Sequence, residues 1–230
     1  GVTPNLSLSG TVNPDFSQVE ADVAQLDLNT RFALFYPEKR PFFLEAADTF
    51  ETPIDVVHTR TMVDPAWGGK LTGKVGSGAL GAYTVRDEVS NLLFPGTEGS
   101  SGASLDDEST ASVARYRQDI GGSSTLGALI TDRRATGYRN SVHGLDLDLR
   151  FTPTDSLKIQ GLGSETAYPE EIVERHDQPG GTFDGHALAL GYEHQTATWE
   201  LEGEYVEISP GLRADLDDHR HRRPPGVGFD

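Results

Sequence analysis

Several residue types are rare or missing in this 230-residue sequence. It contains no cysteine, one methionine and two tryptophans. The absence of cysteine excludes structural disulfides, thiolate metal sites and a cysteine nucleophile. No run of about 18 apolar residues occurs, so no transmembrane helix is encoded. The opening GVTPNLSLSG also lacks the basic and apolar regions of a signal peptide, and we expect any export signal to be missing from this stretch of chain.

Basic residues are scarce as well. Against 36 Asp and Glu there are only 19 Lys and Arg, which gives a formal charge of −17. Binding to nucleic acid needs clustered basic residues, so we expect no nucleic-acid partner. The sequence also has no nucleophile elbow, zinc-protease helix, phosphate loop or dinucleotide fingerprint. We therefore predict no cofactor and no metal, and catalysis has no positive support.

Glycine and proline are plentiful, with 26 and 13 copies, which is typical of many short strands joined by turns. Two segments alternate strictly between apolar and charged residues, Ser141–Phe151 and Thr196–Glu207. The charged positions of these segments are Asp146, Asp148, Arg150, Glu200, Glu202 and Glu204. Three glutamates on one face of a strand require water beside them.

Similar alternation recurs along most of the chain. The other predicted strands are Asn5–Asn13, Val23–Leu34, Ile54–Met62, Trp67–Val75, Ala79–Asp87, Ser109–Asp119, Ser124–Arg134, Ser156–Glu165 and His186–Tyr192. Tight turns near Gly76, Gly121 and Pro153 alternate with two long polar loops, Leu92–Glu108 and Tyr168–Phe183. This rhythm predicts an all-β fold, an antiparallel up-and-down meander of the outer-membrane barrel type, present as a partial barrel of roughly 10–12 strands.

Aromatic residues near the strand ends are expected to form the girdle of such a barrel. They are Trp67, Tyr83, Tyr116, Phe151, Trp199 and Tyr205. The alternative is a soluble β-sandwich, in which the same residues would fill the core. We expect one domain over residues 1–214, followed by an irregular, disordered tail over residues 215–230, where an acidic run passes into HRHRRPP.

The segments NPDFSQVEAD (Asn13–Asp22) and PEKRPFFLE (Pro37–Glu45) resemble the bacterial family known as domain of unknown function 5916. The resemblance implies an outer-membrane β-barrel that follows a domain similar to a carbohydrate-binding module. It also implies that these 230 residues are a fragment of the barrel. Bacterial outer-membrane localisation, contact with outer-membrane lipid and a loose association with carbohydrate are expected on the same basis, whereas the oligomeric state is left open.

The stretch Phe32–Glu45 is the one candidate site. A functional reading gives Glu38 and Glu45 as paired carboxylates, with Lys39 and Arg40 as an anion clamp beside aromatic residues that could stack on a sugar. A structural reading makes it a rigid corner, in which Pro37 and Pro41 fix the backbone and the charges pair locally. The structural reading is favoured.

The leading hypothesis is an outer-membrane barrel that serves transport, anchoring or scaffolding, with a role in carbohydrate uptake as one possibility. Its polar interior would be lined by Asp146, Asp148, Arg150, Glu200, Glu202 and Glu204. The alternative is a carbohydrate-binding or glycoside-hydrolysing β protein that uses the Phe32–Glu45 cluster.

Overall fold

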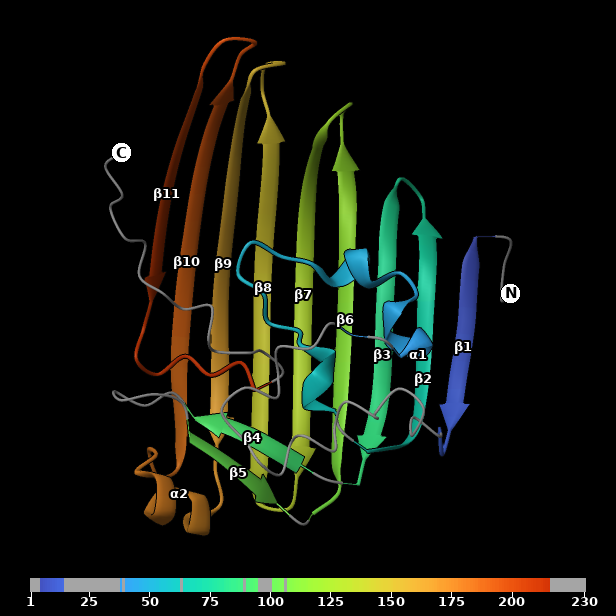
Figure 1. The fold of residues 1–230 in the computed structure, drawn as a ribbon, viewed down its shortest axis with the longest axis vertical. Coiled ribbons are helices and arrows are strands. Elements are labelled where there is room, and N and C mark those ends of the chain that lie inside the picture. Colours follow the sequence, from blue (N-terminus) through green and yellow to red (C-terminus); the bar gives the residue numbers. More distant parts are fainter. Residues whose placement is uncertain are drawn as a thin grey trace.

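The computed structural model describes residues 5–14, 38, 40–62, 64–88, 90–94, 101–105 and 107–215 (Figure 1). Nine strands form the main sheet: β1 Leu6–Val12, β2 Pro65–Val75, β3 Gly78–Asp87, β6 Ser109–Ile120, β7 Ser124–Ala135, β8 Tyr138–Arg150, β9 Asp155–Ala167, β10 Thr182–Gln195 and β11 Glu200–Ile208. The smaller elements are α1 Pro41–Leu44, the 3-10 helices η3 Ala47–Phe50 and η4 Thr59–Thr61, α2 Glu170–His176, and a two-stranded sheet of β4 Ser90–Phe94 and β5 Ser101–Leu105.

The main sheet is antiparallel throughout and follows the order β1-β2-β3-β6-β7-β8-β9-β10-β11. Neighbours in this order follow one another along the chain, with β4 and β5 set aside. The predicted all-β antiparallel meander is therefore confirmed. Within the part of the chain described above, the sheet is open, with β1 and β11 at its edges.

Three segments differ from the sequence-based prediction. Ile54–Met62 is not a strand, because the backbone of Ile54 bonds to the Gln160 side chain and Thr59–Thr61 winds into η4. The predicted loop Leu92–Glu108 contains β5 and most of β4, and the loop Tyr168–Phe183 contains α2. The predicted strand Val23–Leu34 lies outside the described residues.

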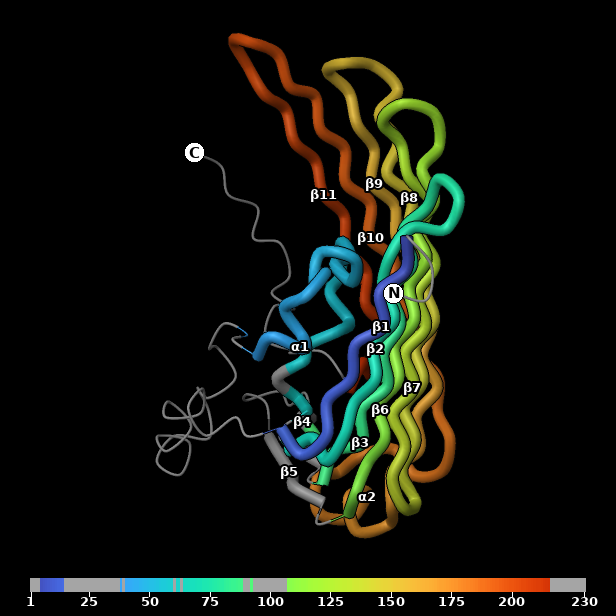
Figure 2. Tube along the Cα trace, turned by 90° about the vertical axis from the view of Figure 1, so that its right-hand side faces the viewer, coloured from blue at the N-terminus to red at the C-terminus, as the bar shows by residue number. Residues whose placement is uncertain are grey.

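The two faces of the main sheet have opposite surroundings (Figure 2). Residues 40–62 and 209–215 lie on one face, here called the covered face. The other face carries none of the described segments and is called the open face. Since side chains alternate along each strand, the strand register assigns every strand residue to one of these faces.

The two ends of the main sheet also differ. Four short turns, at residues 76–77, 121–123, 151–154 and 196–199, lie at one end, which we call the short-turn end. The connections at the other end include the β4–β5 hairpin and α2, as Figure 1 shows. None of the helices that the structure describes is long and apolar enough to cross a membrane.

The hydrophobic core lies between the covered face and the segments upon it. Phe43, Phe50, Val56 and Met62 pack against the strand residues Tyr83, Val85, Val113, Leu129 and Val142. Two glycines permit the close approach of the covering segments. A Cβ atom at Gly81 would lie 2.8 Å from the Phe50 ring, and one at Gly185 would lie 2.1 Å from the backbone nitrogen of Leu212. Tyr83, expected in an aromatic girdle, is instead part of this core and 5% exposed.

Candidate functional site: the covered face

The charges of the PEKRPFFLE segment form a buried ion pair. The Arg40 side chain is 3% exposed, and its Nε and Nη2 atoms donate to the two carboxylate oxygens of Glu38 at 2.8 and 2.7 Å. Its Nη1 and Nη2 atoms also donate to the carbonyl oxygens of Met62 and Thr59, at 2.5 and 2.8 Å. Arg40 thereby links the two ends of residues 40–62, the segment that covers this face of the sheet.

Glu38 is held in its ionised form. Burial by itself would raise the pKa of this carboxyl group, but hydrogen bonds and positive charge from Arg40, with a hydrogen bond from the Thr59 hydroxyl, lower the pKa to about 2. A general acid in glycoside hydrolysis needs a raised pKa so that it carries a proton near neutral pH. Glu38 has the opposite property and is unsuited to that role.

Phe42 and Phe43 are the aromatic residues of Phe32–Glu45 that the structure describes, and residues 32–37 lie outside the described residues. Phe43 is buried, lies 4.3 Å from the guanidinium carbon of Arg40, and meets Phe42 and Tyr83 edge to face at 5.1 and 6.1 Å. Phe50 meets Tyr83 in the same way at 5.2 Å. A platform for sugar stacking needs an exposed ring face, which Phe43 and Phe50 do not offer.

Lys70 holds the helix α1 to the sheet. It projects from β2 on the covered face, is 2% exposed, and donates to the carbonyl oxygens of Phe42, Phe43 and Glu45. The last carbonyls of a helix have no partner within it, so a cation at this place satisfies them. The carboxylate of Glu45 lies on an exposed residue. Lys39 lies outside the described residues.

Further along the covering segment, Gln160 of β9 makes a two-point contact with Ile54. Its Oε1 atom accepts from the Ile54 nitrogen at 2.5 Å, and its Nε2 atom donates to the Ile54 oxygen at 3.2 Å. Beside it, Arg115 of β6 forms an ion pair with Asp146 of β8 at 2.8 Å, across the intervening Gly127. Beneath the apolar residues of segment 40–62, the sheet thus carries four polar side chains: Lys70, Arg115, Asp146 and Gln160.

The segment 209–215 has its own anchor on the central strands β7 and β8 and at Tyr168, just after β9. The Asp215 carboxylate accepts from the hydroxyls of Tyr138 and Tyr168, at 2.8 Å and 3.0 Å. Asn140 bonds to the Arg213 oxygen and the Asp215 nitrogen, and Arg133 donates to the Asp215 oxygen. Burial, followed by the charge of Asp215, raises the pKa of Tyr168, so its hydroxyl remains a donor. Asp215, placed in the tail by the sequence, is buried here.

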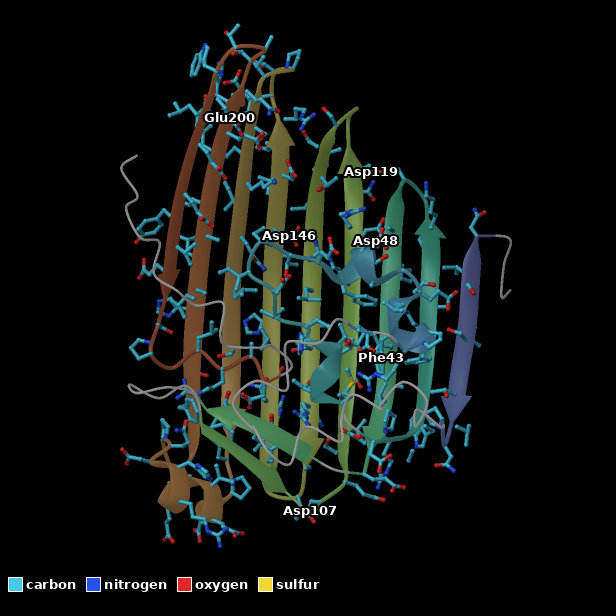
Figure 3. All side chains as sticks on the ribbon, in the orientation of Figure 1. Phe43, Asp48, Asp107, Asp119, Asp146 and Glu200 are labelled. Atoms are coloured by element: carbon cyan, nitrogen blue, oxygen red, sulfur yellow. The ribbon has the colours of Figure 1, made fainter. Side chains whose placement is uncertain are left out.

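The six charged strand residues singled out from the sequence all lie on the covered face by register: Asp146, Asp148, Arg150, Glu200, Glu202 and Glu204. Only Asp146 is buried. The three glutamates project from the edge strand β11 toward the short-turn end, where Glu202 lies opposite Glu193 of β10 (Figure 3 labels Asp146 and Glu200). Among the described residues no group of three or more His, Cys, Asp or Glu is arranged to hold a metal.

Sequence reasoning missed the residues that anchor the covering segments. Four of these residues, all on the covered face, are Lys70, Arg115 and Gln160 in the middle of their strands and Asn140 near the start of β8. The alternation of residues along each strand predicts which face they occupy. Their partners could not be predicted, because the covering segments have no periodicity that gives their register against the sheet.

Comparison with known proteins gives two matches. The first 60 residues match the family model described as Domain of unknown function (DUF5916), which confirms the resemblance. No curated protein matches. The structure is similar to OmpTdeltaL8 (loop L8 deletion mutant of OmpT), an outer membrane protein of Vibrio cholerae, with a TM-score of 0.40 and 14% identity over 70% of this chain. The chain covers 52% of that structure, so it spans about half its length.

Proposed function

We propose that the nine-stranded sheet is part of the wall of a bacterial outer-membrane β-barrel, with its open face toward lipid and its covered face toward the lumen. The observation that carries this proposal is an apolar face that no described segment covers, opposite a face on which charged and polar side chains are buried beside the core residues. On the open face Leu145 is 64% and Ile130 52% exposed, whereas Arg133 and Asn140 on the covered face are 0% and 1% exposed. A water-soluble sheet with one covered face carries polar residues on its uncovered face, whereas here Leu126, Ile130 and Leu145 are exposed there.

The open face is organised in rows across the strands. One row contains Leu126, Leu147, Ile159 and Leu190, and the next contains Ala128, Leu145 and Leu188. Exposed aromatic residues, Phe151, Tyr192 and Trp199, lie beyond these rows at the short-turn end. An apolar band flanked by aromatic residues is what a barrel presents to a bilayer. Short turns at one end, and longer connections at the other in every case but the two-residue turn between β7 and β8, agree with the same architecture.

For the role of the barrel we propose transport or anchoring, with the lumen narrowed by residues 40–62. The carboxylates of Glu193, Glu202 and Glu204 at the short-turn end of the covered face would favour cations or neutral solutes over anions. We include carbohydrate uptake in this proposal only because the family resemblance implies an association with carbohydrate. For the alternative, catalysis or sugar binding by the Phe32–Glu45 cluster, only residues 38 and 40–45 are described, and among them Glu38 is ion-paired with Arg40 and Phe43 is buried.

Site-directed labelling tests the proposal, because the chain has no cysteine of its own. Glu204 and Tyr205 are adjacent, both exposed, and on opposite faces of β11. In liposomes, a spin label at Tyr205→Cys or Leu145→Cys should be accessible to oxygen and protected from a water-soluble nickel chelate, and a label at Glu204→Cys should show the reverse. Equal access of the chelate to both faces, or a monodisperse monomer without detergent, would contradict the proposal.

A further inference from the structure

Three arginines lie in one row across the open face, beyond the apolar band. Arg86 of β3 is opposite Thr110 of β6, Thr110 is opposite Arg134 of β7, and Arg134 is opposite Arg139 of β8. The side chains of Arg86, Arg134 and Arg139 are 43%, 62% and 49% exposed. We infer that this arginine row binds the phosphate groups of anionic lipid headgroups, an inference that rests on the proposed function.

The position of the row matches the headgroup layer. Along β7 the open face reads Leu126, Ala128, Ile130, Asp132 and Arg134. Arg134 is four residues beyond Ile130, or about 13 Å along the strand and less along the membrane normal when the strand is tilted. The interfacial layer outside the hydrocarbon begins within a few Å of the last apolar row, and arginine side chains extend into it.

The arginines are held in place by acidic residues. Arg134 Nε is 2.5 Å from an Asp132 carboxylate oxygen, Arg139 Nη1 is 3.3 Å from a Glu165 oxygen, and Arg86 pairs with Glu108. Asp132, Glu165 and Asp184 form a row one step nearer the apolar band. Exposed ion pairs of this kind contribute little to stability, so their main effect is to orient the guanidinium groups.

The chemistry of the row favours phosphate over a neutral headgroup. Arg134 and Arg139 lie directly opposite each other, and the Asp132 carboxylate lies beside both, 2.5 Å from Arg134 Nε and 3.7 Å from Arg139 Nε. Each guanidinium has five N–H donors, of which its carboxylate partner occupies only some. A phosphate group beyond the row accepts the remaining donors from two neighbouring arginines, and the planar guanidinium fork suits its oxygens.

Lipid retention measured by native mass spectrometry tests the inference, with phosphatidic acid and phosphatidylcholine of equal chain length as probes. The wild-type protein should retain phosphatidic acid preferentially, and added salt should weaken the preference. The double variant Arg134→Gln/Arg139→Gln should lose about fivefold in affinity per arginine, or roughly 25-fold. The matched control Lys158→Gln removes one positive charge from an exposed residue of the covered face and should retain the preference.

The outcomes separate the inference from the function on which it rests. If the wild-type protein enters neither bilayers nor micelles, the proposed membrane location fails. If it inserts but retains both lipids equally, or if the double variant and Lys158→Gln lose phosphatidic acid to the same extent, the arginine row is not a phosphate site and the membrane location stands. The comparison of lipids on the wild-type protein decides the matter even where the double variant folds poorly.

Discussion

The buried ion pair between Glu38 and Arg40 makes a quantitative prediction about acid stability. The pKa of Glu38 is lowered from 4.5 to about 2 in the folded protein. A shift of this size corresponds to about 3 kcal/mol of folding free energy. Because the folded pKa is depressed, this contribution is fully present above the unfolded pKa of 4.5 and is lost as the pH falls toward 2.

Glu38→Gln removes the same contribution at neutral pH and leaves Arg40 buried without its carboxylate. We expect a loss of about 3 kcal/mol at pH 7, since breaking one partner of a buried pair costs roughly 3–5 kcal/mol. The assay is urea unfolding in detergent micelles, followed by circular dichroism, at several values between pH 7 and pH 2. The difference between wild type and variant isolates Glu38, because the other carboxylates titrate in both proteins.

The difference should shrink as the pH falls below 4.5 and nearly vanish near pH 2. A matched control is Glu171→Gln in the exposed pair with Arg175, which we expect to change stability by less than about 1 kcal/mol. The reasoning is refuted if Glu38→Gln unfolds like the wild type at pH 7, or if its deficit is the same at every pH.

Three further predictions concern the covering segments. Lys70→Met should lower the unfolding free energy by about 1–3 kcal/mol, because the carbonyls at the end of α1 lose their donor. Amide hydrogen exchange should become faster in α1 and stay unchanged in β7 and β8. Asp215→Asn should cost about 2 kcal/mol, because the bonds from the two tyrosine hydroxyls to a buried charged acceptor become weaker bonds to a neutral one; urea unfolding that matches the wild type would contradict the anchor. Gly185→Val should displace residues 209–215 and expose them to limited proteolysis, whereas Gly203→Val, which meets no atom within 4 Å, should leave the cleavage pattern unchanged.

The meander could be predicted from the sequence because each strand carries its own evidence. In β8, for example, Leu145, Leu147 and Leu149 alternate with Asp146, Asp148 and Arg150, and alternation fixes the two faces independently of any neighbour. The tight turns at Gly76 and Gly121 have positive φ angles of 64°, which agrees with the glycine-based turn predictions.

The covering segments could not be predicted in the same way. Ile54–Met62 has the β-branched residues of a strand, yet its conformation is set by contacts from distant positions, such as Gln160 and Arg40. The ion pair of Glu38 with Arg40 was expected from their short separation. The burial of this pair was not expected, because it depends on packing against the covered face of the sheet, which carries Tyr83, and not on residues nearby in the sequence.

The contacts that hold the covering segments have a consequence for how the sequence is free to change. Lys70, Gln160, Asn140 and Arg133 all bond to backbone atoms of those segments, and Arg40 closes its loop on the carbonyls of Thr59 and Met62. Backbone atoms are the same for nearly every residue type, so most substitutions in residues 46–62 keep these attachment points. Residues 46–62 can therefore vary in sequence while the strand residues that hold them stay fixed.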